Sequence, residues 1–154
     1  MNTEALKQLI AELIVAASAL AGYPAPAANP TVVLVTHEQL EQQACGHPCR
    51  VFGWSPPGSI VYLDNRLDLA ADLFAQSILV HELTHYLQQE SGKYGQHVTC
   101  REWIEREREA YLVQYRWLAR KQGSPVTMPP EVSGMHWLIS CNDTPPNDNA
   151  GLGG

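Results

Sequence analysis

The stretch His81-Glu82-Leu83-Thr84-His85 (HELTH) lies inside a long apolar segment, LFAQSILVHELTHYLQQ, at residues 73–89. On an α-helix, residues four positions apart lie one turn apart on the same face, so His81 and His85 can direct two imidazole nitrogens at one point. Glu82 lies about 100° further round such a helix, where it can reach a water molecule held at that point. The stretch therefore predicts a helix that carries two zinc ligands and a general base.

The alternative interpretation is a buried helix with no metal. Its histidines would be hydrogen-bonded core residues, and Glu82 would pair with an arginine. Burying three polar groups together in a run as apolar as SILVHELTHYL costs free energy unless a partner satisfies all of them. A metal ion is such a partner, so the pattern favours a metal site.

The length and composition indicate one domain. The chain has 154 residues, of which 45% are hydrophobic and 17% charged, which is enough for a proper core. We assign this domain to residues 1–141 and expect the polar, Pro- and Gly-containing tail 142–154 to be disordered. The net charge is −6 and no cluster of Lys and Arg stands out, which argues against nucleic acid or an anionic membrane as a partner. Oligomeric state stays open.

An apolar segment at residues 3–21 is predicted to form a helix, with Thr3 as its N-cap and Gly22 as its stop. A secretory signal peptide is the alternative for this segment. Glu4 and Glu12 break the basic-then-apolar order of such peptides, so a structural helix is favoured. No segment is long enough to span a membrane.

The remaining elements follow from β-branched runs, helical periodicity and turn residues. They predict an α+β single domain, in which a small mixed or antiparallel sheet packs on the HELTH helix between an N-terminal helix and a C-terminal helix. The predicted elements are strands at 31–36, 51–54 and 59–63, a helical turn at 38–44, the HELTH helix at 69–90 with capping side chains from 64–68, and a last helix at 101–122.

A catalytic zinc site needs a third protein ligand besides the two histidines. A histidine six residues beyond His85, the metzincin solution, is excluded because Ser91 stands there. The other common solution is a glutamate on a following helix. The segment after Cys100 offers four: Glu102, Glu105, Glu107 and Glu109.

Helical geometry separates these four glutamates. Glu107 falls in the middle of the apolar stripe of its helix, together with Gln114. The other three fall where they can pair with Arg106 and Arg108 on a solvated face. A carboxylate inside an apolar stripe needs a cation, which a zinc ion on the neighbouring helix would supply. A buried pair of Glu107 with an arginine such as Arg66 is the alternative.

A family resemblance rests on the same residues. HELTH followed 22 residues after His85 by Glu107-Arg108-Glu109-Ala110-Tyr111 resembles the gluzincin branch of the zincin metallopeptidases. The run HELTHYLQ with EREAYLVQYRWL is also similar to a small family of uncharacterised bacterial zincin-like proteins. The resemblance implies a zincin-like fold for this α+β domain, in which His81, His85 and Glu107 bind zinc and Glu82 is catalytic. It also implies that the protein hydrolyses peptide bonds of a peptide or protein substrate.

One position departs from the gluzincin pattern. Tyr111 stands where that pattern often has an aspartate that hydrogen-bonds a ligand histidine. A phenol supplies no negative charge to raise ligand basicity, so we expect weaker metal affinity or activity. The candidates for an oxyanion donor or a contact to a ligand are Tyr94, His97, Tyr111 and His136. The resemblance also implies that strand 59–63 is the edge on which a peptide pairs.

The rival function is a zincin-fold regulator or binding module that binds zinc without catalysis. The presence of Glu82 argues against it, because a purely structural site has no use for a base there. The chain lacks the large second lobe that helps many gluzincins build a deep substrate pocket, which predicts a short, shallow cleft. The segment 128–138, with two prolines and His136, is a hypothetical cover of that cleft.

The four cysteines predict two disulfides, Cys45–Cys49 and Cys100–Cys141, from proximity in sequence. Free buried thiols, or a second zinc site that includes His47, are the alternatives. Disulfides would indicate the bacterial periplasm or a secreted protein and free thiols the cytoplasm, so the compartment stays open. We expect His37 and His47 to be surface residues.

Overall fold

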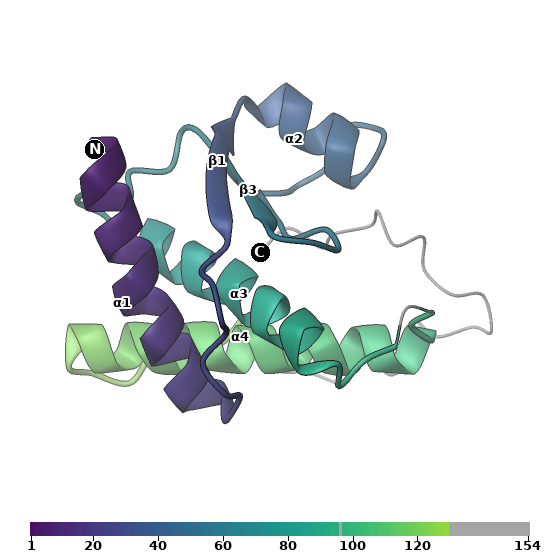
Figure 1. Cartoon of the computed structure of the whole chain (residues 1–154). Coiled ribbons are helices and arrows are strands. Elements are labelled where there is room, and N and C mark those ends of the chain that lie inside the picture. The colour runs from purple at the N-terminus through teal and green to yellow at the C-terminus, as the bar shows by residue number, and fades with distance from the viewer. Residues whose placement is uncertain (96, 130–154) are drawn as a thin grey trace.

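The computed structural model describes residues 1–95 and 97–129 of the chain (Figure 1). These residues form an α+β fold of helices and one mixed sheet, as predicted. His136, Cys141 and the predicted tail at 142–154 lie outside the described residues. The elements are α1 (Thr3–Ala21), β1 (Thr31–Val35), α2 (His37–Ala44), β2 (Gly53–Trp54), β3 (Ile60–Asp64), α3 (Leu73–Ser91) and α4 (Cys100–Gln122).

The sheet has the strand order β1-β3-β2, with β1 parallel and β2 antiparallel to β3. Leu63 in β3 pairs with Leu34 on one side and with Gly53 on the other. The prediction that strand 59–63 is a free edge is therefore wrong. The chain folds back through residues 55–58 and places the short β2 on one side of β3, so the edge strands are β2 and β1.

Helices cover both faces of the sheet. In Figure 1, α2 lies on the outer side of the sheet and α3 crosses its other side. The long α4 runs behind α3, and α1 packs against both. No helix in the described part of the chain combines the length and apolar character needed to cross a membrane.

Helix α3 forms the centre of the molecule. Every residue from Ser77 to Gln88 is buried, because the sheet, α1 and α4 surround the helix. Its leucines and valines join the core of the domain. Polar side chains in this stretch have little access to water, so they must find partners inside the protein.

The helix ends are set by capping side chains. Asn2, and not the predicted Thr3, caps α1 by accepting a 2.8 Å hydrogen bond from the amide of Ala5. Helix α3 begins at Leu73, later than predicted, because Asp72 accepts from the amide of Phe74 at 2.8 Å. Thr99 caps α4 in a capping box with Glu102, so this helix begins at Cys100.

A disulfide lies in the loop between α2 and β2, and a polar cluster joins α2 to β3. Cys45 and Cys49 form the predicted disulfide, which removes both thiols from any second metal site. The Cys100–Cys141 half of the pairing stays a prediction, because Cys141 lies outside the described residues. His47 is exposed, as predicted. His37 is not a simple surface residue: its ring lies 2.9 Å from buried Asp64 and 3.0 Å from Glu41.

Candidate metal centre

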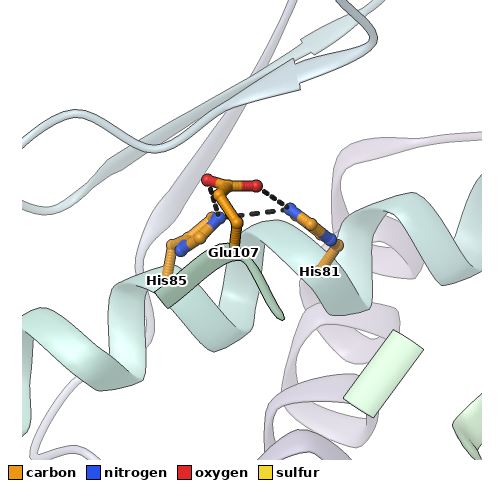
Figure 2. Close-up of side chains that lie close together, drawn as sticks. All are labelled: His81, His85 and Glu107. Carbon is orange, nitrogen blue, oxygen red and sulfur yellow. Dashed lines mark hydrogen bonds and ion pairs between the residues drawn. The ribbon is translucent and has the colours of Figure 1, made fainter. Parts of the chain in front are cut away.

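Three side chains from two helices converge on one point (Figure 2). His81 and His85 extend from adjacent turns of α3, and their Nε2 atoms lie 3.1 Å apart. Glu107 reaches them from α4, with Oε1 at 3.0 Å from His85 Nε2 and Oε2 at 3.4 Å from His81 Nε2. All three residues are buried. The predicted helical face of Glu107 is confirmed, and this group could hold a metal ion.

Two glutamines fix the orientation of the imidazole rings. Gln88 Oε1 lies 2.8 Å from Nδ1 of His85, while the Gln88 amide nitrogen donates to the carbonyl of Arg106 at 3.0 Å. Gln114 Oε1 lies 3.1 Å from Nδ1 of His81, while its amide nitrogen donates to Ser77 Oγ at 3.1 Å. Since each amide nitrogen already has an acceptor, each carbonyl oxygen faces a ring, and both Nδ1 atoms must donate.

These tautomers leave both Nε2 atoms as acceptors when the rings are neutral. Two imidazole lone pairs and a carboxylate then point at the same place, and Glu107 Oε2 is buried with no hydrogen-bond partner among the described residues. Such an arrangement requires positive charge, either protons on the rings or a metal cation. Imidazole nitrogens and carboxylate oxygens are donor types that metal ions bind, and here they converge on one point. The donor set therefore fits a metal ion.

The electrostatics of the pair His85 and Glu107 agree with this requirement. Burial alone would raise the pKa of Glu107, but positive charge on His85 and His81 outweighs it and holds that pKa well below its usual value. Burial opposes the charged form of His85, yet Glu107 raises its pKa. The carboxylate of Glu107 is thus ionised and available as a ligand.

Glu82 lies beside the three converging side chains and against the edge strand. A Cβ atom added to Gly53 in β2 would stand 2.6 Å from Cγ and 2.7 Å from Oε1 of Glu82, closer than real contacts allow. Glycine is therefore required at position 53 for Glu82 to occupy its place. Burial raises the pKa of Glu82, against the lowering effect of the two histidines. A carboxyl with a raised pKa is suited to exchange protons near neutral pH.

The site opens into a cleft of about 520 Å³ between the β2–β3 segment and helices α3 and α4. This volume lies within the usual range for small-molecule and short-peptide sites. The lining includes Trp54 and the two prolines of the β2–β3 turn, together with Tyr94, Trp103 and Arg106. His81, Glu82, His85 and Glu107 all line the cleft, so the converging side chains are reachable from it.

The other glutamates predicted for α4 have different roles. Glu102 completes the cap of α4, and Glu105 is exposed. Glu109 pairs with Lys93 at 3.0 Å instead of with Arg106 or Arg108. Arg66 pairs with Asp64, so the alternative partner for Glu107 is also ruled out.

The structure distinguishes among the four residues predicted as an oxyanion donor or a contact to a ligand. Tyr94 lines the cleft, and its hydroxyl lies 3.3 Å from Glu109 Oε2. Tyr111 is buried with its ring against that of His81, at 4.4 Å between centroids, so it packs on this candidate ligand while Gln114 accepts the ring N–H. His97 is exposed and does not line the cleft. His136 lies outside the described residues.

The sequence interpretation missed Gln88 and Gln114 as contacts of the histidines, and Gly53 as the neighbour of Glu82. Gln114 carried a signal, since it falls in the same apolar stripe as Glu107. Gln88 lies three residues after His85, which places it on the same face of α3. Nothing local in the sequence marks Gly53.

Comparison of the chain with protein-family models, with curated protein sequences and with solved structures gave no match.

Proposed function

We propose that this protein is a zinc-dependent peptidase with a gluzincin-type site, in which His81, His85 and Glu107 bind the metal and Glu82 is the general base. The observation that carries the proposal is the convergence of the three buried donors at one point, with Glu82 beside them and a cleft above them. Two imidazoles and one carboxylate with an open position are a donor set typical of catalytic zinc.

The proposed chemistry divides between the metal and the protein. His81, His85 and Glu107 would hold the zinc ion, which would supply Lewis acidity toward a water molecule and a carbonyl group. Glu82 accepts the proton of the attacking water and passes it to the leaving amine. Gln88 and Gln114 hold the imidazole rings so that both Nε2 atoms face the point where the metal would be held.

The edge strand supports a peptide substrate. Phe52 and Trp54 direct their backbone groups toward β3, as shown by the 2.9 Å bond from the amide of Asp64 to the carbonyl of Phe52. In an antiparallel pair these directions alternate, so Gly53 directs its N–H and C=O away from β3, and it lines the cleft. A substrate backbone in extended conformation can pair with these two groups.

The test is hydrolysis of a mixture of short peptides by the zinc-loaded protein, followed by mass spectrometry. We expect cleavage by the wild type and a loss of roughly 10²-fold to 10⁴-fold in rate for Glu82→Gln, which keeps its zinc. Glu105→Gln, on the exposed face of α4, is the matched control and should cleave like the wild type. Zinc binding without cleavage of any peptide would contradict a peptidase and favour the zinc-binding regulator.

A further inference from the structure

Arg106 is a cationic side chain that lines the cleft and forms no ion pair within the described part of the chain. It is the only lysine or arginine among the described residues that line the cleft. It forms no ion pair with any described Asp or Glu, although Glu107 is its neighbour in sequence. Its Nε atom is buried and has no hydrogen-bond partner in the described part of the chain. A charge in this position is suited to an incoming anion.

The surroundings hold this guanidinium beside the converging donors. Its carbon Cζ lies 5.9 Å from the centre of the Tyr94 ring, which is a cation–π distance. The Tyr94 hydroxyl donates a hydrogen bond to Glu109, which forms an ion pair with Lys93. The backbone of Arg106 is fixed separately, since its carbonyl accepts from Gln88. Arg106 lines the same cleft as His81, His85 and Glu107, so an anion bound to its guanidinium lies in the space next to the candidate metal point.

We propose that Arg106 is a substrate-binding residue that receives a carboxylate close to the bond that is cleaved. Guanidinium groups bind carboxylates through two parallel N–H···O bonds, and such charged hydrogen bonds are the strongest that a cleft offers. The inference rests on the proposed peptidase function and narrows its substrates to peptides that carry a carboxylate near the scissile bond. The carboxylate can be the C-terminus of the peptide or the side chain of an Asp or Glu.

A binding experiment tests the inference without relying on turnover. The protein is the zinc-loaded Glu82→Gln variant, and the measured signal is tryptophan fluorescence, because Trp54 and Trp103 line the cleft. The probes are four peptides of one length and one apolar core. They combine a free or amidated C-terminus with a Glu or a Gln at one internal position, so the two sources of carboxylate are separated. Each titration is repeated without zinc.

We expect at least one carboxylate peptide to bind roughly tenfold or more tightly than the peptide with neither group. That advantage should fall to about twofold when Arg106→Gln is added, and part of it should return with Arg106→Lys, which keeps the charge but loses the fork geometry. The control is Arg108→Gln, on the exposed side of α4, which should keep the full advantage.

Three results would overturn the inference: equal binding of all four peptides, no binding of any of them, or a preference that survives Arg106→Gln. These are distinguishable from failure of the proposed function. If carboxylate peptides bind through Arg106 but the wild type neither takes up zinc nor cleaves peptides, the proposed peptidase function is wrong. The carboxylate-binding role of Arg106 then stands. If the wild type cleaves peptides with no effect of the carboxylate, the peptidase stands and the inference is wrong.

Discussion

Nδ1 of His85 lies 2.8 Å from Oε1 of Gln88, and the same glutamine donates to the backbone of Arg106. One neutral side chain therefore orients a candidate ligand on α3 and ties it to α4, next to Glu107. This contact takes the place that a carboxylate often has behind a ligand histidine.

Replacing Gln88 should weaken metal binding. In Gln88→Leu, His85 loses the acceptor for its Nδ1–H, and we expect zinc affinity to fall about 10-fold to 100-fold in competition with a chromophoric chelator. Gln88→Glu should not restore it, because one carboxylate oxygen would then face the carbonyl of Arg106. The matched control is Gln42→Ala on the exposed face of α2. Unchanged affinity in Gln88→Leu would show that this contact does not support the site.

A single methyl group at position 53 should impair the base and spare the ligands. The Cβ of Gly53→Ala would overlap Glu82, so Glu82 must move. We expect peptide hydrolysis to fall on the order of 10²-fold, with zinc content unchanged. Gly95→Ala adds the same methyl group elsewhere in the cleft lining, where nothing lies within 4 Å, so Glu82 keeps its place and hydrolysis should stay close to that of the wild type. Equal hydrolysis by both variants would mean that the contact between Gly53 and Glu82 does not position the base.

Asp64 should contribute stability that depends on pH. Burial would raise its pKa, but hydrogen bonds from Arg66 and His37 outweigh burial and lower it. Because the pKa is lower in the folded protein, this contribution is present above the unfolded value, 3.8, and is lost as pH falls through the folded value.

Urea unfolding of the wild type and of Asp64→Asn checks this expectation. At pH 7 the variant should be less stable by roughly 1 to 3 kcal/mol, the usual cost of losing hydrogen bonds to a charged group. At pH 3 and below the difference should shrink. The control is Asp68→Asn, whose carboxylate bonds only to exposed turn amides among the described residues. A difference that stays constant with pH would assign the loss to packing and not to charge.

The disulfide between Cys45 and Cys49 should have a modest effect. Its two cysteines are four residues apart, so it closes a very short loop. Loop entropy then predicts a loss of about 2 kcal/mol in the free energy of unfolding for Cys45→Ser with Cys49→Ser. Zinc content should not change, because both sulfurs lie in a different cluster from the candidate site. A loss of zinc in this variant would contradict that separation.

The sequence was most informative where structure depends on local periodicity. The i, i+4 spacing of His81 and His85, and the position of Glu107 in an apolar stripe, depend only on the 3.6-residue turn, so the convergence of the three residues could be predicted. That these residues bind zinc stays a prediction. Helix starts were less accurate, because several aspartates compete for the cap and the sequence does not show that Asp72 caps α3.

The parts that could not be predicted depend on contacts between distant segments. The edge position of β2 arises because the chain folds back onto β3, which a two-residue strand does not signal. The pairing of Glu109 with Lys93 depends on the loop between α3 and α4. The role of Gly53 depends on where β2 meets Glu82, and no local pattern encodes that meeting.

The most direct measurement is the zinc content per chain by elemental analysis, after zinc is supplied and excess is removed, for the wild type and three folded variants. We predict about one zinc for the wild type, for Glu82→Gln and for Glu109→Ala, and a large loss for Glu107→Ala, since a catalytic zinc needs three protein ligands. A wild type that holds no zinc, or a Glu107→Ala variant that holds as much as the wild type, would contradict the metal centre.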